Sequence, residues 1–154
     1  MTTESRATES RTTASRSKTV GYWAATALAA LAFISGGAFD LARGDQVRAI
    51  MSHLGYPLYF AALIGAWKVL GALAILAPRL PRLKEWAYAG MFFDLSGAAI
   101  SHGSVGDPPA RWLTPLAILA VVVASWALRP KSRVLRGADP AVGPAGRVSV
   151  PVAA

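Results

Sequence analysis

The chain has 154 residues, enough for one domain, of which 54% are hydrophobic and only 16% are charged, whereas soluble domains usually carry about 25% charge. It contains no cysteine, which excludes disulfides, thiolate nucleophiles and cysteine-ligated iron–sulfur clusters. The net charge of +8 lies mostly in the tails and short loops rather than among aromatic residues. This distribution indicates membrane topology rather than nucleic-acid binding.

The order of segments predicts an all-α protein. Residues 1–19 are rich in Ser, Thr and Arg and lack an apolar stripe, so we expect a disordered tail. Residues 129–154 are basic and then rich in Pro, Gly and Ala, which predicts a flexible tail. Four apolar segments lie between the tails, each close to the roughly 20 helical residues that cross a bilayer. They span residues 20–41, 57–77, 84–103 and 112–128, and predict a four-transmembrane-helix bundle over residues 20–128.

Lysine and arginine positions predict the orientation of that bundle. Twelve of these residues lie in the two tails and the middle loop, and three lie in the other two loops. Basic residues remain on the cytoplasmic side. We therefore expect a multi-pass protein of the bacterial inner (plasma) membrane with both termini in the cytoplasm.

Two charged residues lie inside the second and third apolar segments. Lys68 is thirteen residues before Pro81 and Asp94 is thirteen after it, so antiparallel helices would hold both at nearly the same depth. Small residues flank each charge at helical spacing, and such residues let membrane helices approach closely. The spacing predicts a tight helix pair that buries a Lys68–Asp94 ion pair. The pair either fixes helix register only or marks a functional site.

The outer end of the predicted bundle adds candidate acid–base groups. Asp40 closes the first segment and His102 closes the third, while His53 lies in the first loop. We take Asp94, His102 and Asp40 as candidate catalytic residues, because buried carboxylates and histidines can exchange protons near neutral pH. No group of histidines and carboxylates has zinc or di-iron spacing, so we expect no metal and no resident cofactor.

Four residues are candidates for binding a flat, lipid-soluble ligand. Lys68 could hydrogen-bond a polar head group, and the adjacent Trp67 could stack on a ring, although an aromatic residue within a helix more often serves packing. Tyr56 and Tyr59 lie at the start of the second segment, near the same outer end.

These segments resemble the DoxX-like family of small four-helix membrane proteins over roughly residues 20–128. The resemblance implies an integral membrane bundle, and the founding members of the family are small subunits of a membrane thiosulfate:quinone oxidoreductase. Relatives often carry a lysine after a Ser-Gly motif where this chain has Asp40. The motifs that carry the resemblance are His53-Leu54-Gly55-Tyr56-Pro57, Leu63–Ala72, Pro78, Leu83–Gly90, Phe93–Ala98 and Ser101-His102.

Several functions follow from these observations. The first hypothesis is an accessory subunit of a quinone-linked or other redox process, in which Lys68 holds a head group and Asp94 balances its charge or accepts a proton. The alternatives are a stand-alone membrane enzyme acting by acid–base chemistry on a lipid-soluble molecule, a small proton-coupled transporter, and a non-catalytic scaffold. The expected partners are the lipid bilayer, a quinone or similar molecule, and a redox partner protein or a second copy of the chain. Nucleic acid is not expected.

Overall fold

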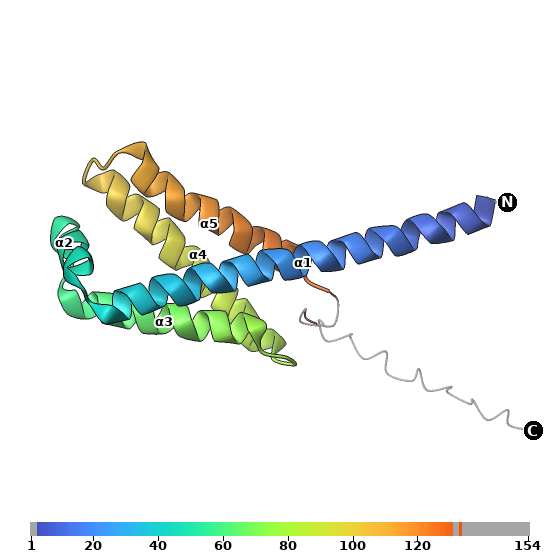
Figure 1. The fold of residues 1–154 in the computed structure, drawn as a ribbon, viewed down its shortest axis with the longest axis horizontal. Helices are drawn as coiled ribbons and strands as arrows, with labels where there is room; N and C mark the ends of the chain where they lie inside the picture. Colours follow the sequence, from blue (N-terminus) through green and yellow to red (C-terminus); the bar gives the residue numbers. More distant parts are fainter. Residues whose placement is uncertain (1–2, 131–132, 134–154) are drawn as a thin grey trace, which may run out of the picture.

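The computed structural model describes residues 3–130 and 133, and this part of the chain holds five α-helices and no strand. The helices are α1 (Thr3–Ala42), α2 (Asp45–His53), α3 (Leu58–Leu76), α4 (Pro81–Ser104) and α5 (Pro109–Ala127). Four long helices form the bundle, and the short α2 lies at the end opposite to the N-terminus (Figure 1). We refer to these two ends of the bundle as the α2 end and the tail end.

Helix α1 is longer than the sequence predicted. It begins at Thr3 and runs for 40 residues, so residues 3–19, expected to be disordered, are helical. No Gly or Pro occurs before Gly21, and therefore nothing in the sequence stops a helix from extending out of the apolar segment. The first half of α1 projects beyond the other helices (Figure 1). Of the predicted flexible tail 129–154, residues 131–132 and 134–154 lie outside the described residues.

Three helical segments of the described chain are long and apolar enough to cross a membrane. They are Arg16–Ala42, Leu58–Leu76 and Pro109–Ala127. Helix α4 has 24 residues, which is sufficient length, but Asp94, His102 and several serines make it less hydrophobic than the other three. The expected count of four spans therefore stays a prediction for α4.

The short α2 occupies a segment that the sequence analysis treated as a loop. Its buried residue is Val47, and Ile50 and Met51 follow at helical spacing on the same side. This nine-residue helix is too short to register as an apolar segment. It lies beside the adjoining ends of α1 and α3 (Figure 1).

The closest helix crossing joins α1 to α3. A Cβ atom added to Gly37 would lie 2.8 Å from the carbonyl oxygen of Gly65, and one added to Gly65 would lie 2.8 Å from that of Gly37. The close approach of α3 to α4 predicted from their small residues is absent at two glycines of α4, because a Cβ atom at Gly90 or Gly97 would meet nothing within 4 Å. These two glycines of α4 leave space beside α3.

A buried lysine joins α3 to α4 at the tail end. Lys84, which the sequence analysis counted as a loop charge, is 1% exposed. Its Nζ donates to the carbonyl oxygens of Ala74 (3.1 Å) and Ile75. A cation at the C-terminus of a helix satisfies carbonyl groups that have no partner within the helix and also favours the helix dipole. Lys84 therefore fixes the end of α3 against the start of α4.

Candidate functional site

Lys68 lies between two carboxylates inside the bundle. Its Nζ donates a hydrogen bond to Asp40 Oδ2 at 2.9 Å and lies 3.9 Å from Asp94 Oδ2. All three side chains are largely buried, with exposed fractions of 23% for Lys68, 16% for Asp40 and 18% for Asp94. We call these three residues the charge cluster. The sequence analysis predicted an ion pair between Lys68 and Asp94, whereas the hydrogen bond of Lys68 goes to Asp40.

The glycine crossing explains why Asp40 reaches Lys68. Asp40 follows Gly37 by three residues, Lys68 follows Gly65 by three, and the two helices run antiparallel. The long lysine stem therefore has to extend back toward the α2 end to meet the carboxylate. A Cβ atom on Gly65 would lie 3.0 Å from Asp40 Cβ, so a larger residue at this position would displace the aspartate.

Asp94 has an incomplete set of partners. Its Oδ2 atom is buried and has no hydrogen-bond partner among the described residues, because 3.9 Å from Lys68 Nζ is too long for a hydrogen bond. Leaving a buried acceptor unpaired costs about 1–3 kcal/mol, and more for a charged group. Such an atom marks a place where a ligand or water can bind.

Two cavities meet at the charge cluster. The first, the α3–α4 cleft, has a volume of about 490 Å³, and the second, the α2-end chamber, has a volume of about 350 Å³. Lys68 and Asp94 line both of them. The cleft is otherwise mainly apolar and includes Trp67, Leu70, Leu83, Trp86 and Met91. The chamber also includes Asp40, Tyr56, Phe60, Ser101 and His102.

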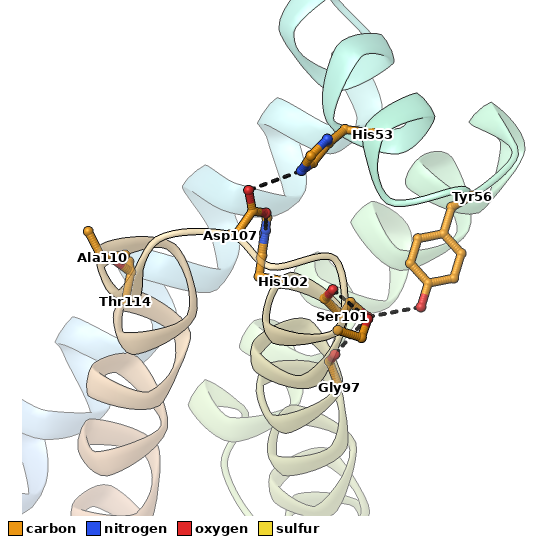
Figure 2. Close-up of polar contacts among 9 residues, drawn as sticks. His53, Tyr56, Gly97, Ser101, His102, Asp107, Ala110 and Thr114 are labelled. Carbon is orange, nitrogen blue, oxygen red and sulfur yellow. Dashed lines mark hydrogen bonds and ion pairs between the residues drawn. The ribbon is translucent and has the colours of Figure 1, made fainter.

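A second polar group lies at the surface of the α2 end. Asp107 accepts hydrogen bonds from His53 Nε2 at 3.0 Å and from His102 Nδ1 at 2.6 Å (Figure 2). The turn that carries Asp107 contains Gly106 at a φ of 77°, a conformation that favours glycine. The hydrogen bond from His102, followed by the one from His53, holds the pKa of Asp107 below its ordinary value of 3.8.

These histidines line a third cavity. This end-face pocket has a volume of about 590 Å³ and is lined by His53, His102, Asp107, Arg111 and other residues of α2 and α5. His102 therefore lines both the end-face pocket and the α2-end chamber. Asp107 was not among the candidate site residues, and the one available signal was its place in the loop directly after His102.

The aromatic candidates have different surroundings. Tyr56 Oη is hydrogen-bonded to Ser101 Oγ at 2.9 Å, and Ser101 in turn donates to the carbonyl oxygen of Gly97 (Figure 2). Trp67 lines the α3–α4 cleft with its side chain 65% exposed. Tyr59 is 70% exposed and is not among the residues that line the three cavities. Six of the candidate residues therefore line neighbouring cavities, and Tyr59 lies apart from them. The six are Lys68, Asp94, Asp40, Tyr56, Trp67 and His102.

Metal ligands do not gather at these sites. Within residues 16–130 and at residue 133, whose side chains the structure describes, no group of three or more His, Cys, Asp or Glu side chains is arranged to hold a metal ion.

The comparison with known proteins concerns the helical bundle. No curated protein and no solved structure matches the chain significantly. The model of the DoxX-like family matches residues 24–125, which is more than half of the 154 residues and covers the charge cluster and both cavities that meet there. The chain belongs to the DoxX-like family.

Proposed function

We propose that this protein binds the head group of a quinone, or of a similar carbonyl-bearing lipid-soluble molecule, in the α3–α4 cleft. In this proposal it serves as an accessory subunit of a quinone-linked redox process in a bacterial plasma membrane. Helices α1, α3, α4 and α5 cross the bilayer, and both tails lie in the cytoplasm. The observation that carries the proposal is the position of Lys68 and Asp94 at one side of an otherwise apolar cleft.

The size and lining of the cleft support a ligand of this class. Its volume of about 490 Å³ falls within the roughly 300–1,000 Å³ of small-molecule sites, which are mostly apolar with a few polar groups that fix orientation. Trp67 and Trp86 line it and are 65% and 81% exposed. Because their exposed faces would meet acyl chains, a lipid-soluble molecule can enter sideways from the bilayer.

The charge cluster supplies complementary groups for a quinone ring. Lys68 has three N–H donors, and Asp40 takes one of them, so another can be donated to a quinone carbonyl oxygen. Asp94 Oδ2, which has no hydrogen-bond partner among the described residues, can accept a hydrogen bond from the hydroxyl group of the reduced form. A ligand without oxygen atoms on its ring would leave these groups unpaired and should bind more weakly.

Calorimetric titration of the protein in detergent with decylubiquinone tests the proposal. A hydrogen bond from a charged donor contributes about 1.5–3 kcal/mol, so Lys68→Met should raise the Kd about 10- to 150-fold. Lys18→Met is the matched control, because Lys18 is exposed and lies in α1 far from the cleft, and its Kd should equal that of the wild type. Circular dichroism confirms that each variant remains helical.

Two results would overturn the proposal. The first is a wild-type protein that binds no quinone under these conditions, which would leave the charge cluster a structural role only. The second is a Kd that is unchanged by Lys68→Met in a folded variant.

A further inference from the structure

The end-face pocket, the α2-end chamber and the α3–α4 cleft are neighbours, because each shares lining residues with the next. His102 belongs to the end-face pocket and to the α2-end chamber, and Lys68 and Asp94 belong to the chamber and to the α3–α4 cleft. We infer that this series is a water-filled proton path that leads from the aqueous phase at the α2 end to Asp94. The inference deepens the proposed function by naming the source of protons for the cleft, and the path can be tested without quinone.

The charge balance of the cluster creates a need for such a path. One lysine faces two carboxylates, Asp40 from α1 and Asp94 on α4. Fully ionised, the cluster carries one negative charge, and an unbalanced charge within the bilayer is costly. The cluster is therefore neutral only with one bound proton, and a ligand that binds or leaves with a change of charge requires that proton to move.

The chamber has the room and the polar groups for a chain of water. Asp94 and Ser101 are seven residues apart on one face of α4, which is about 10 Å along the helix, so a few hydrogen-bonded waters are needed to connect them. The volume of about 350 Å³ could hold about ten waters at roughly 30 Å³ each. Tyr56 Oη and Ser101 Oγ, which are hydrogen-bonded to each other, belong to residues that line the chamber, and Ser101 directly precedes His102.

The histidine–aspartate group connects the chamber to bulk water. Asp107 is faced by His53 from α2, His102 from α4 and the nearby Arg111 of α5. His102 uses Nδ1 for Asp107, which leaves Nε2 to exchange a proton, and an imidazole can take up a proton at one nitrogen and release it from the other. His53 is half-exposed, with 47% of its side chain accessible, so it lies where protons arrive from solvent.

The absence of cysteine allows a clean accessibility test on the full chain in vesicles. Ala98→Cys places a thiol in the chamber, while two neighbours in α4 serve as controls: Ala99 is buried elsewhere and Ile100 is 71% exposed on the lipid side. A small cationic methanethiosulfonate that cannot cross membranes should modify Ala98→Cys at least tenfold faster than either control. It should do so only from the side of the α2 end. Protection of Ala98→Cys from both sides, or modification from the tail end, would overturn the path.

Infrared spectroscopy follows the proton itself. The carboxyl band of Asp94, identified by its loss in Asp94→Asn, should respond to a pH jump on the α2 side. We expect His102→Leu to slow this response at least tenfold. The control Tyr59→Phe, at an exposed residue that lines none of these three cavities, should leave it unchanged. If the leucine variant fails to fold, the same rate is measured in His102→Asn, which keeps a polar side chain. An unchanged rate in a folded His102 variant would contradict the role of His102. If the protein binds no quinone but Ala98→Cys is still modified from the side of the α2 end, the proposed function is overturned and the proton path is not.

Discussion

Alanine at Gly37 is expected to separate α1 from α3. The added Cβ atom would lie 2.8 Å from Gly65 O, 2.9 Å from Val69 Cγ2 and 3.1 Å from Lys68 Cβ. Two of these contacts involve backbone or the stem of a buried residue, so they cannot be relieved by turning the end of a flexible side chain. The helices must move apart by about half an ångström, and overpacking of this kind typically costs about 1–3 kcal/mol.

The neighbouring Gly36 provides a matched control. A Cβ atom there would meet nothing within 4 Å, and replacing glycine by alanine in a helix stabilises it by about 0.5–1 kcal/mol. Both variants make the same chemical change one residue apart, so effects on the unfolded chain largely cancel. Because the helical gain from alanine is common to both variants, Gly37→Ala should be less stable than Gly36→Ala by the overpacking cost alone, about 1–3 kcal/mol.

The assay is unfolding of the purified protein in mild detergent by added sodium dodecyl sulfate, followed by circular dichroism. Each variant gives a free energy of unfolding, and the comparison needs only their difference. Equal stabilities for Gly36→Ala and Gly37→Ala would refute the α1–α3 crossing. The placement of Asp40 beside Lys68 would fall with it, because the same crossing brings the two residues together.

Two further predictions concern the charged groups. Double-mutant cycles in the same unfolding assay measure how strongly Lys68 interacts with each aspartate. The coupling energy of Lys68→Met with Asp40→Asn should exceed that with Asp94→Asn by about 1 kcal/mol, because only Asp40 accepts a hydrogen bond from Lys68. Equal coupling energies would contradict this geometry. The lowered pKa of Asp107 means that the ionised carboxylate stabilises the folded state above about pH 4, and that this stabilisation is lost as the pH falls through the lowered pKa. Asp107→Asn should therefore melt below the wild type at pH 6 and approach it near pH 3. A melting-temperature difference independent of pH would argue against the prediction.

The sequence could locate Lys68 and Asp94 because their positions depend only on the turn between α3 and α4. Equal distances from Pro81 predicted a similar depth for the two residues, although Pro81 is the first residue of α4 rather than the midpoint of the turn. Asp40 could not be assigned in this way, since its position relative to Lys68 depends on the crossing of α1 and α3. The chain between these helices includes α2, so distance along the sequence does not give their register.

Glycine patterns showed where helices could approach but not which partner they would meet. Gly65 has the same spacing to Lys68 as Gly97 has to Asp94, yet Gly65 packs on α1 and Gly97 faces open space. Which helix packs against a glycine depends on side-chain packing across the whole bundle, and the sequence of one helix does not determine this packing. For the same reason Tyr56 and Tyr59, three residues apart, were equivalent in the sequence and differ in the structure: one reaches Ser101 and the other is exposed.

The geometry of the charge cluster favours a functional reading over a purely structural one. A lysine that served only to join two helices would be satisfied by Asp40 alone, with a hydrogen bond at 2.9 Å. A second carboxylate, with an oxygen 3.9 Å from the lysine and no hydrogen-bond partner among the described residues, adds a desolvation cost and no hydrogen bond within the protein. Such a residue decreases stability unless something outside the chain completes it. The two cavities that meet at Asp94 provide room for that partner, a head group on one side and water on the other.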